Sequence, residues 1–187
     1  MKYDCILLAA GLSSRMEQWK LELQYNGKTL IENAIDNASR QTENIIVSGG
    51  FNYLHLNKIL HDYNRIHLVN NPDYEKGMIT SIKAALPFVK TDKFFIALSD
   101  MPLISPEIYL QMSSIEFDQA LFPVYEGSRG HPVLIDTSLI DSILSIPDSG
   151  RMKDFLNTCS VSEMKVKDNG VLFDVDTMSD YRKLLDL

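Results

Sequence analysis

Short, uninterrupted apolar runs separated by segments with helical periodicity constrain the fold of this chain more than any other feature. Four such runs lie at residues 5–10, 45–48, 66–69 and 94–98. Apolar residues that follow one another without polar alternation are typical of strands covered on both faces. Strands of this kind, alternating with helices, predict an α/β fold with a doubly wound, mostly parallel sheet.

The remaining segments complete this pattern. Apolar residues recur at helical spacing in residues 29–39 and 53–63 and in a stripe from Met78 to Leu86. The C-terminal third is more mixed and reads as an elaboration of the sheet. We expect strands there at 118–124, 131–135, 161–166 and 171–175, and helices at 137–145, 151–157 and 177–186. With no internal repeat or long linker, residues 1–187 are expected to form one domain.

Composition excludes several classes of protein. The formal charge is −7, which argues against sequence-independent binding of nucleic acid. No apolar run approaches the roughly 18 residues that cross a bilayer, and no secretory signal is evident. Cys5 and Cys159 form neither a disulfide framework nor a zinc motif. We therefore expect a cytoplasmic protein with no membrane or nucleic-acid partner.

The loop after the first predicted strand, residues 8–20, combines small residues with two cations. Small residues ending at Gly11 would let backbone N–H groups approach a phosphate, and Arg15 and Lys20 could neutralise its oxygens. The loop is neither a dinucleotide fingerprint nor a P-loop. A tight turn with two solvated cations fits the spacing equally well.

Carboxylates follow two other predicted strands. Asp100 comes directly after the most apolar run, where a metal-bound phosphate would sit, although a lone Asp before a proline is more often a turn or cap residue. Asp174 and Asp176 would share one face of a strand. Asp176 or Thr177 also fits the N-cap of the last helix. The residues alone leave these alternatives open.

The segment 123–133 contains Arg129 between two glycines, followed by His131 and a proline. Such a sequence predicts a shaped loop rather than a simple hairpin. His131 could contact a substrate or act as an acid or base, but a histidine satisfied by backbone groups is the commoner case. The other histidines are interpreted as structural or surface residues: His55, His61 and His67.

Taken together, these motifs resemble the Rossmann-like nucleotidyltransferases of the MobA-like NTP transferase family. The main resemblance is Leu8-Ala9-Ala10-Gly11-x-Ser13-x-Arg15-Met16 followed by Lys20. Within that group the chain most resembles the molybdenum cofactor cytidylyltransferases. The supporting segments fall in family order: Gly27-Lys28-Thr29-Leu30-Ile31, Gly77-Met78-x-x-Ser81-Ile82, Ser99-Asp100-Met101-Pro102, Arg129-Gly130-His131-Pro132-Val133 and Asp174-Val175-Asp176-Thr177.

The resemblance implies a reaction in which the phosphate of molybdopterin, or of the molybdenum cofactor, attacks the α-phosphorus of CTP and releases pyrophosphate. Arg15, Lys20 and Asp100 would be catalytic, with Arg15 and Lys20 holding the triphosphate. Asp100 and Asp176 would bind Mg²⁺, with Mn²⁺ as a possible substitute. Arg129 and His131 would face the pterin. The residues implied to line the nucleotide are Leu8, Ala9, Ala10, Gly11, Asn71, Gly77 and Ser81.

Two features separate the possible activities. Leu-Ala-Ala-Gly and Gly-Met-Ile-Thr-Ser favour cytidine over guanosine, because guanylyl-transferring relatives typically show other residues there. Glu17 stands where the family usually has glycine. The alternatives are a nucleotidyltransferase with another base or a sugar or alcohol phosphate acceptor, and a non-catalytic protein that delivers cofactor to a molybdenum hydroxylase. A hydroxylase apoprotein is also a possible partner of the enzyme. A nicotinamide-dependent oxidoreductase is disfavoured because the glycine-rich loop is missing.

Overall fold

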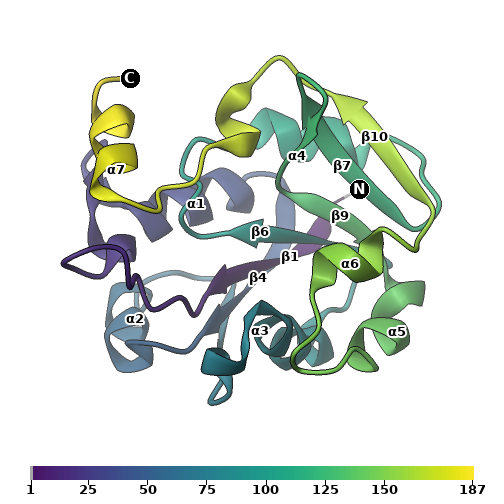
Figure 1. Cartoon of the computed structure of the whole chain (residues 1–187), viewed down its shortest axis with the longest axis horizontal. Helices are drawn as coiled ribbons and strands as arrows, with labels where there is room; N and C mark the ends of the chain where they lie inside the picture. The colour runs from purple at the N-terminus through teal and green to yellow at the C-terminus, as the bar shows by residue number, and fades with distance from the viewer. Residues whose placement is uncertain (1) are drawn as a thin grey trace.

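The computed structural model describes residues 2–187, which form an eight-stranded mixed sheet with helices on both faces (Figure 1). The strand order is β5-β4-β1-β6-β9-β7-β10, with β8 paired to β7. Parallel pairing joins β5, β4, β1 and β6, and also β10 and β7, whereas β9 is antiparallel to both its neighbours. The predicted doubly wound, mostly parallel sheet is therefore confirmed. The strands are β1 (Tyr3–Ala9), β4 (Thr42–Gly49), β5 (Ile66–Asn70), β6 (Lys93–Leu98), β7 (Ala120–Tyr125), β8 (Ser128–Arg129), β9 (Val133–Asp136) and β10 (Val161–Lys165).

The chain reverses its direction of sheet growth beside β1. Strands β4 and β5 extend the sheet on one side of β1, and β6 then pairs with β1 on the other side. Leu8 of β1 aligns with Ser48 of β4 and with Leu98 of β6, so the three carboxyl ends lie at one edge. Ligands of open α/β sheets bind at such a switch point, which makes this edge the place to look for a site.

Alternating side chains of β1 pack into two separate hydrophobic cores, as expected for a strand covered on both faces. Cys5 and Leu7 pack in one core beneath α1, α2 and α4, and Ile6 packs in the other against α3, α5 and α6. All three side chains are fully buried. The helices are α1 (Leu30–Ser39), α2 (Tyr53–Ile59), α3 (Met78–Ala85), α4 (Pro106–Ser113), α5 (Ile140–Leu144) and α6 (Met152–Leu156).

The C-terminal helix α7 (Met178–Leu185) returns to the N-terminal part of the chain (Figure 1). A small third core joins Val175 and Leu184 to Leu23 and Leu30. Leu23 and Leu30 flank a short hairpin, so α7 lies against the segment that follows the first loop. The hairpin and the 3₁₀ turns are β2 (Gln24–Tyr25), β3 (Lys28–Thr29), η1 (Lys20–Glu22), η2 (Tyr74–Lys76), η3 (Leu86–Phe88), η4 (Thr137–Leu139) and η5 (Asn169–Leu172).

Several predicted elements differ from the structure. The strand predicted at 171–175 is wrong: its first two residues belong to η5, which Asp168 caps by accepting from the Gly170 N–H, and the chain then runs as coil. The helix predicted at 53–63 is shorter in the structure, because α2 ends at Ile59. The helix predicted at 137–145 begins as the 3₁₀ turn η4 and continues as α5. Helix α4 was not predicted, although its Ser-Pro start is a helix signal. No helix between residues 2 and 187 has the length and apolar character needed to span a bilayer.

Candidate active site

The crevice at the switch point is built by the last residues of β1 and β6. Ser99 donates from its backbone N–H and from its hydroxyl to the carbonyl of Leu8, at 3.2 and 2.7 Å. These two hydrogen bonds join the ends of β1 and β6, and Ser99 itself is buried. The next residue, Asp100, is thereby fixed just beyond the sheet edge, where its carboxylate faces the loop that follows β1.

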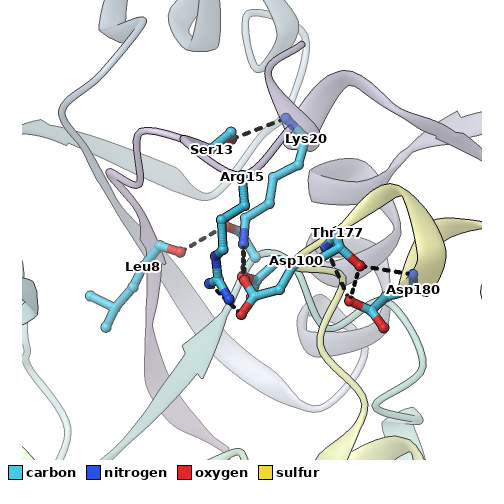
Figure 2. A network of polar contacts seen from close by, with 9 residues as sticks. Leu8, Ser13, Arg15, Lys20, Asp100, Thr177 and Asp180 are labelled. Atoms are coloured by element: carbon cyan, nitrogen blue, oxygen red, sulfur yellow. Dashed lines mark hydrogen bonds and ion pairs between the residues drawn. The ribbon is translucent and has the colours of Figure 1, made fainter. Parts of the chain in front are cut away.

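Four charged side chains from distant parts of the chain meet at this edge (Figure 2). The Lys20 ammonium contacts Asp100 Oδ2 at 2.5 Å and Asp176 Oδ1 at 2.8 Å. Arg15 contacts the other oxygen of Asp176 at 2.6 Å. Lys20 is largely buried, with 13% of its side chain exposed, whereas Arg15 is 65% exposed. The sequence hypothesis placed these four residues in one site, and the structure brings them together.

Electrostatics tie this cluster together. Burial would lower the pKa of Lys20, but the charges and hydrogen bonds of Asp100 and Asp176 outweigh it and raise that pKa. Burial acts to raise the pKa of Asp176, and Lys20 and Arg15 more than reverse this. The pKa of Asp174 is raised by burial and by the carboxylates of Asp176 and Asp100. Three carboxylates therefore create a local demand for positive charge.

Local backbone structure holds the two ends of the cluster in place. The Lys20 N–H donates to Ser13 Oγ at 3.1 Å, and Ser13 itself adopts a left-handed φ of 54°. On the other side, the Val175 N–H donates to the carbonyl of Asp100 at 3.0 Å. Thr177 then starts α7 with a capping box that it shares with Asp180. Asp176 is thus held between a backbone contact and a helix cap.

A cavity of about 200 Å³ opens beside the cluster. Five residues proposed for nucleotide binding line it, together with the proposed metal ligand Asp100: Leu8, Ala10, Gly11, Gly77 and Ser81. A Cβ added at Gly11 would meet no atom within 4 Å, so space is open above this backbone. Gly77 has a φ of 125°, a conformation that favours glycine.

Four predicted nucleotide contacts are not among the residues that line this cavity: Ala9, Arg15, Lys20 and Asn71. Ala9 is 2% exposed and belongs to the core. Asn71 is also 2% exposed, and its amide nitrogen lies 2.9 Å from Thr80 Oγ1 and from Ser81 Oγ. Asn71 therefore braces the first turn of α3, which carries residues that line the cavity.

A second, larger cavity of about 500 Å³ adjoins the first, and Gly77 and Met78 line both. Arg129 and His131 line the larger cavity. Arg129 is paired with Glu163 at 2.7 Å. The His131 ring is buried, which lowers its pKa, and its Nδ1 has no hydrogen-bond partner among the described residues.

Sequence reasoning missed several residues that line these cavities. Ser99 stands at a strand end, and this position was a usable signal. Tyr74, Met78 and Arg151 come from turns or helix starts whose place in the fold no local pattern specifies. The complete set of missed lining residues in the smaller cavity is Leu21, Tyr74, Met78, Leu98 and Ser99. Glu17 is exposed and stands outside the ion-pair cluster.

The residues present fit a divalent metal. Asp100 and Asp176 already converge on one cation, the Lys20 ammonium. Mg²⁺ takes oxygen ligands and is usually held by one or two carboxylates together with substrate phosphates. Among residues 2–187 no cluster of three or more metal-ligating side chains is found, so phosphate and water would supply the other ligands.

A switch-point crevice with paired carboxylates, a buried lysine and an exposed arginine fits the class of α/β nucleotidyltransferases, whose chemistry needs charge and positioning. Comparison with known sequences agrees with this class. Residues 5–164 match the model of the MobA-like NTP transferase domain. The chain belongs to the MobA-like NTP transferase family.

Individual relatives support the same assignment. The chain is 33% identical to the molybdenum cofactor cytidylyltransferase of Escherichia coli K12 over 178 residues, which cover 95% of this chain and 93% of that protein. Rv0371c from Mycobacterium tuberculosis H37Rv has the same fold, with a TM-score of 0.86 and 23% identity over 100% of this chain and 98% of that one. The structure of Rv0371c in complex with manganese superposes with a TM-score of 0.80 and 21% identity, over 100% of this chain and 99% of that one.

Proposed function

We propose that this protein transfers CMP from CTP to the phosphate of molybdopterin or of the molybdenum cofactor and releases pyrophosphate. An oxygen of the acceptor phosphate forms a bond to the α-phosphorus, and the bond from that phosphorus to the bridging oxygen of pyrophosphate breaks. The observation that carries the proposal is the placement of Lys20 between Asp100 and Asp176 at the switch point. The choice of CTP rests on similarity to the Escherichia coli cytidylyltransferase.

The two adjoining cavities suit the two substrates. We place the nucleotide in the smaller cavity, where Gly11 and Gly77 leave the backbone accessible. The acceptor would occupy the larger cavity, with Arg129 and His131 in its wall. Gly77 and Met78 border both, so the α-phosphate and the acceptor phosphate would meet there. Holding both reactants in this geometry removes much of the entropic cost of their encounter.

Arg15 and Lys20 would stabilise the negative charge that develops on the departing pyrophosphate. Both cations bond to carboxylates in this structure. A Mg²⁺ ion held by Asp100 and Asp176 would neutralise phosphate oxygens, and Mn²⁺ could replace it. Lys20 and Arg15 would then turn from the carboxylates to the triphosphate, because their side chains lie at the same edge.

Two other activities keep the same site. A different base, or a sugar or alcohol phosphate acceptor, would change only the cavity contacts. A non-catalytic protein that delivers cofactor to a molybdenum hydroxylase was suggested by Glu17, whose side chain is exposed. Glu17 forms no ion pair with Arg15 or Lys20 in the described chain, so it does not compete with the proposed metal ligands, which favours the enzyme.

We also propose that the whole chain acts as one domain and works in the cytoplasm, where CTP is available. A molybdenum hydroxylase is the proposed recipient of the product.

The decisive experiment is a substrate panel. Pyrophosphate release is measured with CTP, GTP, ATP or UTP, each with molybdopterin and with Mg²⁺, Mn²⁺ or chelator. We expect release with CTP that requires both the divalent metal and molybdopterin. Turnover with inositol phosphate or another simple phosphate ester in place of molybdopterin would show that the acceptor is a different phosphate ester. Binding of molybdopterin without turnover of any nucleotide would favour the delivery protein.

A further inference from the structure

The larger cavity has an unusual charge distribution for a chain with a net charge of −7. Its walls are largely apolar, with Ile79, Ile96 and Leu156 among them. The charged side chains that line it, apart from His131, are all cationic: Lys76, Arg129, Arg151 and Lys153. No carboxylate is found among its described lining residues. This combination suits a ligand with an apolar body and an anionic group.

The four cations are not equally available to a ligand. Arg129 is held by Glu163 at 2.7 Å, and Lys76 by Asp73 at 2.9 Å. Arg151 approaches a carboxylate only at 4.0 Å, and its side chain is 72% exposed. Lys153 forms no ion pair within the described part of the chain. An incoming anion therefore meets Arg151 and Lys153 without displacing an acidic partner, which makes these two the favourable contacts.

The segment that presents these cations is fixed to the fold. Residues 146–151 form a tight turn in which the Gly150 N–H donates to the carbonyl of Pro147 at 2.7 Å. Lys83 of α3 donates to the carbonyl of Ile146 and contacts Asp148 at 3.2 Å. The backbone that carries Arg151 is thus positioned before a ligand arrives, which reduces the ordering cost of binding.

His131 adds a polar side chain to the wall of this cavity. Its backbone N–H donates to the carbonyl of Val171 at 2.9 Å, and the same carbonyl closes the space beside Gly130. The backbone at this position is therefore fixed against the segment 169–172, which holds the cavity wall in place.

We infer that Arg151 and Lys153 supply most of the affinity for the phosphate monoester of the acceptor, while its ring system packs on the apolar wall. The identity of the acceptor as a pterin phosphate rests on the proposed function. The assignment of the anion contact to Arg151 and Lys153 rests on the cavity itself.

A matched pair of fluorescent probes tests the inference at equilibrium. 6-Hydroxymethylpterin and its phosphate ester differ only in the anionic group. We titrate both into the wild type and into R151Q/K153Q, with R40Q/K58Q as a control that removes the same charge from exposed positions remote from the cavity. The phosphate ester should bind the wild type more tightly than the alcohol does. We expect this advantage to fall by about tenfold or more in R151Q/K153Q and to persist in the control.

Other outcomes overturn the inference. It fails if the wild type does not prefer the phosphate ester, or if R129Q loses as much of the preference as R151Q/K153Q does. The test is separable from the proposed function. Cytidylyl transfer that is unaffected in R151Q/K153Q would refute the inference and leave the function standing. Loss of phosphate preference in a protein that never turns over CTP would do the reverse.

Discussion

Lys20 donates to two carboxylates that reach it from the middle and the end of the chain. We propose that this buried ammonium is the counterion of the two carboxylates and turns to the triphosphate when metal and nucleotide bind. Under this proposal Lys20 would exchange carboxylate partners for phosphate oxygens. This exchange makes the residue testable by two unrelated measurements.

Lys20→Met should lower kcat/KM for CTP by about 100-fold, because charge stabilisation of the leaving group is lost. It should also tighten Mn²⁺ binding to the nucleotide-free protein, because the ammonium no longer competes for Asp100 and Asp176. Pyrophosphate release and calorimetric Mn²⁺ titration measure the two effects. Lys28→Met is the matched control, since Lys28 pairs with Asp36 on the surface at 2.5 Å. An unchanged rate and CTP affinity would show Lys20 to be only a structural cation.

Asp100→Ala should abolish turnover and leave the fold intact. The backbone around Asp100 is held by Ser99 and by the Val175 N–H, so the loop keeps its path without the carboxylate. Turnover and the circular dichroism melting curve are compared with those of Asp36→Ala, which removes a surface carboxylate. Retained activity in a folded Asp100→Ala protein would remove this residue from the mechanism.

At the scale of elements, two helices begin with the same capping device but at different places. Thr29 and Glu32 form a capping box at α1, and Thr177 and Asp180 form one at α7. Only the second follows directly on a proposed metal ligand, Asp176. Comparing substitutions at the two caps therefore distinguishes an effect on helix stability from an effect on the geometry of the site.

Thr29→Ala and Thr177→Ala should each reduce the free energy of unfolding by about 1 kcal/mol, as loss of an N-cap commonly does. Only Thr177→Ala should also raise KM for CTP, because the start of α7 positions Asp176. Urea unfolding gives the first quantity and steady-state kinetics gives the second. Equal kinetic effects of the two substitutions would mean that the cap of α7 does not position the site.

For the whole molecule, the ion cluster joins the N-terminal loop, the end of β6 and the start of α7, so it contributes to global stability. The pKa of Asp176 is lowered in the folded state, which means that the unfolded chain binds this proton more tightly. The resulting stability is present above the unfolded pKa of about 3.9 and is lost as pH falls through the lower folded value.

Asp176→Asn should therefore be less stable than the wild type at pH 7, by about 1 kcal/mol for a partly exposed carboxylate. The difference in the free energy of unfolding should shrink as pH falls from 5 toward 3. Urea unfolding of both proteins across this range gives the result. A difference that stays constant with pH would assign the effect to packing or hydrogen bonding instead of charge.

The amino-acid sequence predicts the central strands and helices because apolar runs and helical periodicity depend only on neighbouring residues. Continuous apolar runs specified β1, β4, β5 and β6, and periodicity specified α1, α3 and α7. The signature loop and the two Asp positions pointed to the four charged residues that meet at the switch point, although their catalytic roles remain a prediction. The strand expected at 171–175 failed because a capping contact from Asp168 competes with strand propensity.

Only the tertiary structure decided which distant groups meet and which remain available. Asn71 is predicted to contact the nucleotide, and the fold shows that its amide nitrogen donates to Thr80 and Ser81. Arg129, predicted to face the pterin, and Arg151 border the same cavity, and only the fold shows that Glu163 pairs with Arg129. Periodicity reports burial over a few residues, whereas the ion pair between Arg129 and Glu163 joins residues that are 34 positions apart in the sequence. Sequence thus determined the sheet and its charged edge, and folding alone determined the availability of each charge, because pairing is a property of three-dimensional distance.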